Sequence, residues 1–505
     1  MLIKRVNIYD PIEENYKLGD IRVFGSTILA IAPHLNEQEA EPWIDLSGYF
    51  AYPSFIESHC HLIGTGKKLI EPHLDNIDSQ DELKAILKSV DTDIVCLRGW
   101  SPHASTFKPS RSLLDQWEPH RPVLLIGKCG HIGYVNSKAI VYFSLEACDL
   151  RDGTDLNTGI IKERVLDQAR ACISFEKQQL TEYLVHATQL CKEYGISSAH
   201  SDDWNTSSAA HLLSVLDEQS DLRIYEHINL SPPVLYSDYM NKETIAPFFR
   251  NTPLLSISSF KFMLDGSFGG RSAYLNSPYA DNPLNRGVLY YDAKELQSIL
   301  IKAQECSWST AFHIIGDGAL EVFLSTFKAL APEYQHLKHR LIHVQMASSE
   351  QLDLIKQLDL YVSIQTLFYE ADKEMAEKCL GTIRFRALAY PFKAMVEGKL
   401  NLTLSTDSPI EDINPISNML TAEAFMSRKK AFYYYTVAGA KSIKMEHLQG
   451  TISVGSYADM LFLKEDLFTL PSCQLKTIKP DLVMFNGKWF SDSRKQVSES
   501  EEYNS

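Results

Sequence analysis

The chain has 505 residues and a formal net charge of −15 at pH 7; 45% of its residues are hydrophobic and 22% are charged. This composition is ordinary for a globular protein with a large interior. The acidic balance argues against a general nucleic-acid binder and against a protein that binds anionic membranes, because no surplus of basic residues exists to neutralise phosphates. The length exceeds one ordinary core but suits a large barrel with appended domains.

Cysteine usage and the first residues indicate the compartment. The nine cysteines are scattered, and no Cys-x-x-Cys pair occurs, which favours a reducing environment over a disulfide framework. Residues 1–17 become charged before a long apolar core can form, unlike a signal peptide. The chain also has no run of 18 apolar residues that could span a membrane. We therefore expect a cytoplasmic protein.

Both ends of the chain have the composition of β-strands. Near the start, "LIKRVNIYD" and "DIRVFGSTILAIAP" carry β-branched residues broken by turn residues, and near the end "ADMLFLKED" and "DLVMFNGKWFSD" do the same. Asn486-Gly487 predicts a two-residue hairpin. We expect residues 1–50 and 448–492 to form one composite β-sandwich; two unrelated β appendages are the alternative.

Strand-like and helix-like segments alternate between the two ends. Helices are predicted at residues 79–90, 181–195, 292–303 and 348–358, the first and third with capping boxes at Ser79/Glu82 and Asp292/Glu295. Repeated strand-then-helix units predict a parallel sheet, most economically a closed (β/α)8 barrel, which makes the fold class α/β. We assign residues 51–98 and 178–447 to this TIM-like barrel.

One region breaks the alternation. Residues 99–177 are rich in Pro, Gly and Ser and contain a few separate strand-like runs, so we interpret them as an inserted cap subdomain. Such an insert can cover the face on which the loops after the barrel strands gather. Residues 493–505 are polar without apolar periodicity and are predicted to be disordered.

Side chains that bind metals follow several of the predicted strands. In "YPSFIESHCHL" two histidines alternate at the end of an apolar run, so both project to the same side of a strand. A single such residue is more often structural, but the carboxyl ends of barrel strands meet at one mouth. The set at these ends comprises His59, His61, Lys261, His313, His343 and Asp407.

Lys261 is the unusual member of this set. An ammonium group beside a cation would be repelled, so this lysine should be neutral, distant or chemically converted. A carbamate on Lys261 would be an anionic ligand able to bridge two metals. The alternative is a structural lysine paired with Asp265.

The ordered motifs resemble the amidohydrolase superfamily, and within it the YtcJ-like, amidohydrolase 3 branch that includes N-substituted formamide deformylase. The resemblance covers nearly the whole chain and rests on "PSFIESHCHL", "RGW", "RPVLLIGKCGHIGYVNSKAI", "TGIIKE", "KFMLDGSFGGRSA", "HIIGDGA", "HVQ", "STDSPI", Asn414-Pro415 and "GTISVGSYADMLFL". The chain departs from the usual pattern at Ser54, Glu57 and Ser101.

The resemblance implies a barrel with a composite terminal β-sandwich and a divalent metal centre of one or two ions, commonly zinc. His59, His61 and Asp407 would bind the more buried metal, and His313 and His343 the second. Lys261 aligns with the lysine that is carboxylated in many superfamily members.

The expected reaction is hydrolysis of a C–N bond in a small-molecule amide, N-substituted formamide or cyclic amide by metal-activated water. Asp407 would transfer the proton and His343 would stabilise the oxyanion. Arg271, Trp100 and His131 are candidate substrate-binding residues, each with a structural alternative. Isomerisation, deamination, decarboxylation or a non-catalytic sensor role remain open, and a homodimer is expected because such barrels often pair.

Overall fold

The structure is a computed structural model. Ser101 and the tail at 493–505 lie outside the described residues, which are 1–75, 77–100, 107–128, 130–148, 150, 153–204, 208–219, 221–230, 243, 246–334 and 337–490.

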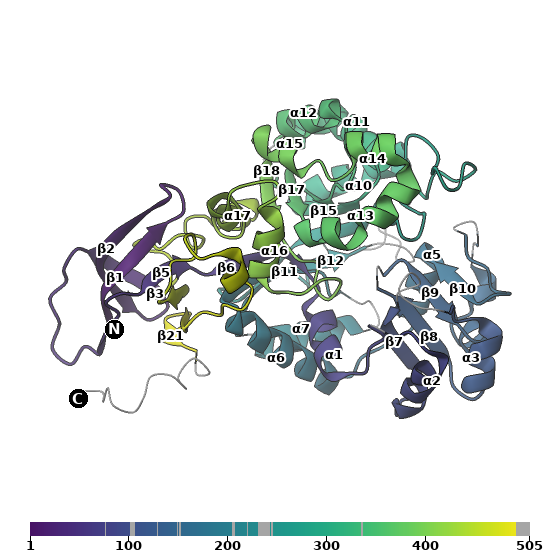
Figure 1. Cartoon of the computed structure of the whole chain (residues 1–505), viewed down its shortest axis with the longest axis horizontal. Helices are drawn as coiled ribbons and strands as arrows, with labels where there is room; N and C mark the ends of the chain where they lie inside the picture. Colours follow the sequence, from purple (N-terminus) through teal and green to yellow (C-terminus); the bar gives the residue numbers. More distant parts are fainter. Residues whose placement is uncertain are drawn as a thin grey trace.

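A nearly closed parallel barrel forms the centre of the molecule, as the alternation of strands and helices predicted (Figure 1). Its strands, in spatial and chain order, are β6 (Phe55–Cys60), β11 (Ile196–Ser201), β12 (Arg223–Asn229), β14 (Leu255–Met263), β15 (Ser309–Ile314), β16 (Arg340–His343), β17 (Tyr361–Ile364) and β18 (Asn401–Leu404). A short strand, β13 (Arg250–Asn251), pairs antiparallel with β14.

Backbone hydrogen bonds bring the first and last barrel strands together. The Asp407 N–H donates to the His59 carbonyl at 2.9 Å, and the His61 N–H donates to the Ser408 carbonyl at 2.7 Å. The segment that follows β18 therefore lies against the end of β6. As a result, the candidate residues nearest the two ends of the barrel sequence become neighbours.

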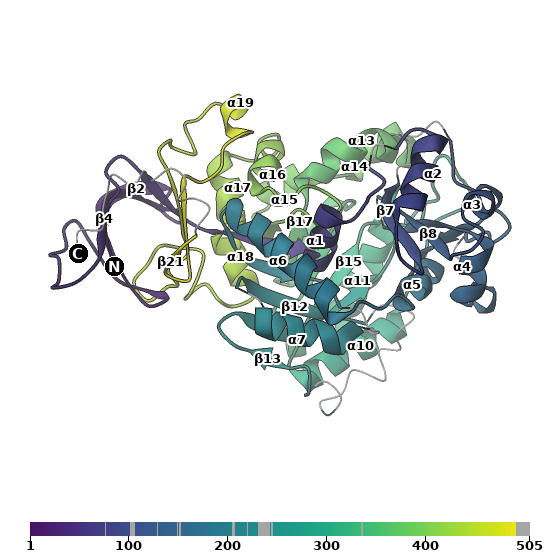
Figure 2. The same ribbon diagram turned by 90° about the horizontal axis from the view of Figure 1, so that it is seen from below.

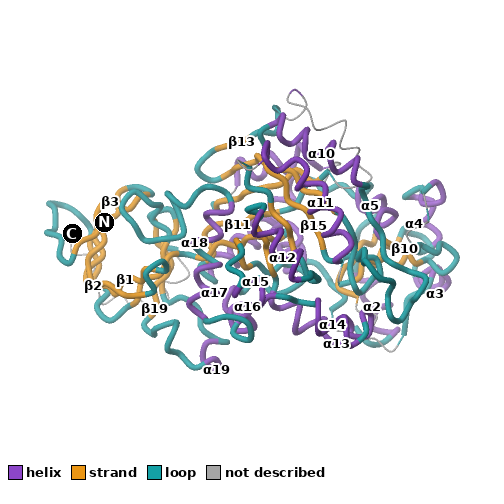
Figure 3. Tube along the Cα trace, turned by 90° about the horizontal axis from the view of Figure 1, so that it is seen from above, coloured by secondary structure: helices purple, strands orange, loops and turns teal. Residues whose placement is uncertain are grey.

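Helices surround the barrel strands (Figure 3). For α10 the Asp292/Glu295 capping box and the buried stripe Leu296, Ile299, Leu300 and Ala303 are confirmed. The surrounding helices are α1 (Leu62–Ile70), α6 (Lys177–Glu193), α7 (Ala209–Gln219), α10 (Ala293–Cys306), α11 (Asp317–Tyr334), α12 (Ser349–Gln357), α13 (Thr366–Leu380), α14 (Thr382–Leu388), α15 (Phe392–Glu397), α16 (Pro415–Ala422), α17 (Arg428–Tyr434) and α18 (Val437–Ser442).

Both chain ends build one β unit. Its sheet runs β21-β20-β19-β5-β1-β2-β3, with β4 also paired to β1, and β5 joins β19 antiparallel. Asn486 and Gly487 have φ of 52° and 74° between paired strands, which confirms the predicted two-residue hairpin. The strands are β1 (Leu2–Asp10), β2 (Asn15–Phe24), β3 (Thr27–Ala32), β4 (Trp43–Asp45), β5 (Phe50–Pro53), β19 (Met460–Leu463), β20 (Leu482–Phe485) and β21 (Lys488–Trp489); a short helix, α19 (Ser472–Leu475), lies between β19 and β20.

The insert has its own sheet, at the opposite end of the barrel from the terminal sheet (Figure 2). The sheet consists of β7 (Val95–Trp100), β8 (Val123–Gly127), β9 (Ile132–Val135) and β10 (Ile160–Lys162). Its helical elements are α2 (Gln80–Ser89), α3 (Arg111–Trp117), α4 (Ser137–Tyr142), the 3-10 turn Leu145–Ala147 and α5 (Glu163–Ala171).

The insert begins earlier than residue 99, where the sequence placed its start. β7 pairs with β8 in the insert sheet, and Leu83 and Leu87 of α2 pack with Val95 and Leu97 of β7. The helical periodicity of this segment was interpreted correctly, but periodicity alone does not tell which sheet a helix covers.

No helix in the described part of the chain combines the length and the apolar character needed to cross a bilayer.

Candidate functional site

Three of the predicted ligands converge on one point at the carboxyl ends of the barrel strands. One ligand atom each from His59, His343 and Asp407 lies within 4.8 Å of the others, and all three side chains are buried. His61 joins them, because its Nε2 and the His59 Nε2 are both 3.2 Å from Asp407 Oδ1. His313 lies next to this group, with its ring centroid 4.5 Å from that of His343.

Hydrogen bonds orient the imidazole rings. The Nδ1–H of His61 donates to the Asp202 backbone carbonyl at 2.5 Å, and that of His343 donates to Gln365 Oε1 at 2.7 Å. Both assignments leave the Nε2 lone pair directed at the centre of the site, the state that a metal ligand requires. His313 donates from Nε2 to the Gly266 carbonyl at 3.2 Å, so its Nδ1 remains available.

The backbone is strained where two of these residues leave their strands. His343 has φ of 80°, the next residue Val344 has 47°, and Asp407 has 58°. Non-glycine residues adopt such values at a cost of about 1–3 kcal/mol each, and these values cluster at functional sites. Both His343 and Asp407 line the cavity at these strained positions.

Burial and neighbouring charges set the protonation states at neutral pH. Burial lowers the pKa of His59, lowers that of His313 well below its usual value, and lowers the pKa of His343 to about 3. Burial of Asp407 favours its neutral form, but His59 and His61 outweigh this effect and lower its pKa well below the usual value. Burial also lowers the pKa of His61, but Asp407 outweighs this effect and raises it. His59, His313 and His343 are therefore neutral imidazoles near an ionised carboxylate, the forms that bind metals.

These residues fit a divalent metal. Asp407 Oδ1 is buried and makes no hydrogen bond of acceptable geometry, although two imidazole nitrogens lie 3.2 Å away. Such a buried acceptor among other acceptors is costly without a cation. Two or three imidazoles with one carboxylate also form a donor set that suits zinc and similar ions.

Lys261 pairs with Asp202 and not with Asp265, the partner that the structural alternative assigned to it. Its Nζ is 2.8 Å from Asp202 Oδ2, and both side chains are buried. The expected partner, Asp265, instead accepts backbone N–H groups at 2.8–3.0 Å, from Tyr274, Ile315 and Gly316. Lys261 Nζ therefore lies beside a buried carboxylate, which comes from the segment directly after β11.

Sequence reasoning missed Asp202. It follows directly after β11 in "AHSDDW", at the same mouth as the predicted ligands. That position was the available signal, because two adjacent aspartates at the end of an apolar strand resemble the context of Asp407. Asp202 contributes its carboxylate to Lys261 and its backbone carbonyl to His61.

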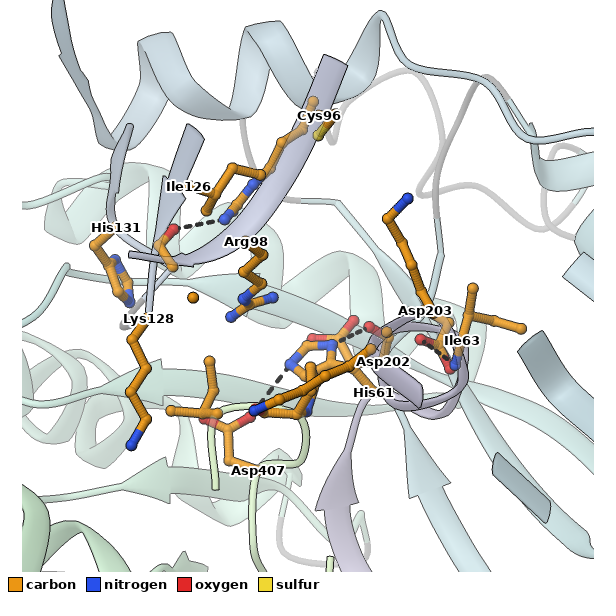
Figure 4. Close-up of a pocket in the computed structure, with 18 of the residues that line it drawn as sticks. His61, Ile63, Cys96, Arg98, Ile126, Lys128, His131, Asp202, Asp203 and Asp407 are labelled. Carbon is orange, nitrogen blue, oxygen red and sulfur yellow. Dashed lines mark hydrogen bonds and ion pairs between the residues drawn. The ribbon is translucent and has the colours of Figure 1, made fainter. Parts of the chain in front are cut away.

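The convergent side chains open into a cavity of about 380 Å³ between the barrel mouth and the insert (Figure 4). The insert supplies Arg98, Lys128, His131 and Arg170 to its wall. A cavity of this volume suits a small-molecule ligand. The sequence-based expectation that the insert covers the site matches this arrangement.

The three candidate substrate-binding residues have different positions. His131 lines the cavity, with its ring centroid 5.1 Å from that of His313. Trp100 is fully buried in the core of the insert, where it packs against Phe107. This core position is the structural role that was the alternative to substrate binding. Arg271 pairs with Asp281 at 2.7 Å, the loop salt bridge that was its alternative.

Glu163, which sequence reasoning did not single out, fixes His131. Its Oε2 lies 2.9 Å from His131 Nδ1 and accepts the Tyr290 hydroxyl at 2.9 Å. Glu163 is buried and has φ of 37°, which adds a strained position on the insert side of the cavity to those at His343, Val344 and Asp407. Its position in the motif "TGIIKE" was the only signal in the sequence.

Known proteins share this architecture. Residues 43–490 match the model of the amidohydrolase family Amidohydro_3. The chain is 25% identical to the Bacillus subtilis protein named "Putative amidohydrolase YtcJ", over 95% of this chain and 97% of that protein. It is 19% identical to N-substituted formamide deformylase of Arthrobacter pascens, over 86% of this chain and 87% of that enzyme.

A solved structure has the same fold. The uncharacterized metal-dependent hydrolase from Pyrococcus horikoshii OT3 superposes with a TM-score of 0.76 at 23% identity, and the match covers 94% of this chain and 99% of that one. The family model spans most of the chain, from within the N-terminal β region, through the barrel, to the last strand. The chain therefore belongs to the amidohydrolase family and is, by class, a hydrolase.

Proposed function

We propose that this chain hydrolyses a C–N bond of a small-molecule amide, N-substituted formamide or cyclic amide. The observation that carries the proposal is the convergence of His59, His61, His343 and Asp407 at the base of the cavity. His59, His61 and Asp407 would hold a divalent metal, for which we propose zinc, with His343 and His313 beside it. When bound, this ion lowers the pKa of a water molecule toward neutrality and polarises a carbonyl group.

Asp407 is the residue to which we assign proton transfer. It is ionised, faces the cavity and has an Oδ1 atom without a hydrogen-bond donor. It can accept a proton from the attacking water and deliver that proton to the leaving nitrogen. The Asp407 side chain is buried at the strand ends with His59 and His61 beside it, so its carboxylate stays at the base of the cavity.

His343 is better suited to a ligand role than to oxyanion stabilisation. Gln365 donates its own amide hydrogens to the Ser363 carbonyl and the Ser405 hydroxyl, so its Oε1 must accept from His343 Nδ1. The neutral ring therefore carries a lone pair, not a hydrogen, on Nε2. This supports binding of a cation at Nε2 and leaves no donor there for an oxyanion.

The test is the substitution Asp407→Asn in zinc-loaded protein. We expect turnover of the best substrate in a panel of formamides, amides and cyclic amides to fall about 10²- to 10⁴-fold, because proton transfer is lost. Formate, amine and ammonia release measure turnover, and metal analysis measures the zinc content. Asn418→Asp, which changes a buried polar residue outside the cavity, is the control for general damage.

Two results would contradict the proposal. In one, Asp407→Asn keeps both its zinc and nearly full activity, which removes the proton-transfer role. In the other, zinc-loaded wild-type protein hydrolyses no member of the panel.

A further inference from the structure

The cap side of the cavity carries two arginines that converge on one place. Arg98 lies on β7, where Val95 and Leu97 point into the core of the insert. Because side chains alternate along a strand, Arg98 points to the other side. Figure 4 shows its guanidinium group descending from β7 into the cavity, toward the side of His61.

Arg170 approaches the same place from α5. A Cβ atom placed on Gly130 would lie 2.9 Å from Arg98 NH2 and 3.5 Å from Arg170 NH2. Gly130 has φ of 78°, which disfavours any side chain at this position. The backbone therefore leaves a space that two guanidinium groups share.

The surrounding chain fixes Arg170. Its NH2 donates to the Gly130 carbonyl at 2.7 Å, and its NH1 lies 3.4 Å from Asp167 Oδ1. Arginine stays protonated in proteins, and its planar donors match the two oxygens of a carboxylate. Carboxylates such as Asp167 line the same cavity, so recognition of a substrate carboxylate here depends on the placed guanidinium donors and not on an excess of positive charge.

We propose that Arg98, with Arg170 behind it, binds a carboxylate of the substrate. This inference rests on the proposed amide hydrolysis and names its substrate class: a small amide that carries a carboxylate group near the scissile bond. The metal-binding residues and Arg98 line one cavity of about 380 Å³. A molecule whose carbonyl lies at Asp407 can therefore place its other end beneath the arginine.

The test compares compounds that differ only in the carboxylate. N-formylphenylalanine and N-formyl-2-phenylethylamine are assayed as substrates, and phenylalanine and 2-phenylethylamine are titrated as non-hydrolysable ligands by calorimetry. Zinc-loaded wild type should favour the carboxylate member of each pair. Arg98→Gln should reduce this preference about 10- to 100-fold, because charged hydrogen bonds are lost.

Two further variants are controls, one for misfolding at position 98 and one for the loss of any positive charge from the cavity wall. Arg98→Lys retains the positive charge but lacks the planar N–H donors of the guanidinium group, so it should keep part of the preference for the carboxylate compounds. Lys128→Gln removes another positive charge from the same wall, from a side chain that pairs with Glu411 at 2.9 Å. It should leave the preference within about threefold of wild type, since rim ion pairs contribute little.

The outcomes separate the two proposals. If no compound is hydrolysed but phenylalanine binding depends on Arg98, the reaction proposal fails for these amides and the carboxylate site is supported. If both formamides are hydrolysed equally well, or if Arg98→Gln keeps the full binding preference, the carboxylate site is overturned and the hydrolase proposal stands.

Discussion

At the scale of single residues, the candidate ligands depend on neighbours that do not face the metal position. Gln365 orients His343, the Asp202 carbonyl orients His61, and the Gly266 carbonyl orients His313. Each partner accepts a ring N–H and thereby fixes which nitrogen carries the lone pair. Such outer partners commonly affect metal affinity as much as they affect geometry.

Gln365→Leu tests this dependence. Loss of the acceptor leaves the buried Nδ1–H of His343 unsatisfied and frees the ring to change tautomer, so zinc affinity or activity should fall about 10- to 100-fold. Competition with a chelator measures the affinity. Gln365→Glu retains an acceptor and is the matched control; equal zinc affinity in Gln365→Leu and wild type would refute the orienting role.

At the scale of elements, helix α10 begins with reciprocal capping bonds. Asp292 accepts the N–H groups of Lys294 at 2.8 Å and Glu295 at 3.0 Å, and Glu295 Oε2 accepts the Asp292 N–H at 2.9 Å. The cap is exposed, so its contribution can be measured without disturbing the barrel interior.

Asp292→Ala should lower the free energy of unfolding by about 1 kcal/mol, because the first turn of the helix loses its acceptor. Urea denaturation of the full chain provides the value. Asp292→Asn, which can still cap the helix, should lose much less than the alanine variant. Equal losses in the two variants would show that the capping bonds are not the cause.

Local patterns predicted both this helix and the one before β7, but not the sheet on which the second helix packs. Asp292, Glu295 and the apolar spacing fixed the start and buried face of α10, and both are confirmed. Residues 79–90 had equally good signals and do form α2. That helix nevertheless packs on the insert, because the choice of sheet depends on the distant pairing of β7 with β8.

At the scale of the whole molecule, one buried ion pair connects the barrel to the terminal β unit. Arg223 starts β12 and pairs with Asp459, which precedes β19, and both side chains are buried. Arg223 also donates to Asn486 Oδ1 at 3.0 Å and lies 3.8 Å from the centre of the Tyr457 ring. The pair therefore joins segments that are far apart in the chain.

Asp459→Leu should destabilise the protein by about 3–5 kcal/mol, because Arg223 becomes a buried cation without its carboxylate. The double variant Arg223→Met/Asp459→Leu should recover most of this loss, since replacing a whole buried pair by apolar groups is often neutral. Urea denaturation of the three proteins measures the coupling. A double variant no more stable than Asp459→Leu would contradict this account.

The candidate site shows where sequence-based prediction reaches its limit in this molecule. The residues at strand ends could be found because a barrel gathers such ends at one mouth, whichever loops connect them. Asp202 and Glu163 were missed, and Trp100 and Arg271 face elsewhere, because these roles depend on side-chain direction in loops and in the insert. A linear pattern does not encode those directions.

The pairing of β5 with β19 also has a consequence for biosynthesis. Phe50–Pro53 finds its antiparallel partner only when Met460–Leu463 has been made. At translation rates of roughly 5–20 residues per second, the edge of this strand that pairs with Met460–Leu463 stays unpaired for a time on the order of tens of seconds during synthesis. An unpaired edge invites wrong pairing with other nascent chains. The terminal β unit therefore forms only after synthesis of the last tenth of the chain has begun, so its earliest strands have one open edge until then.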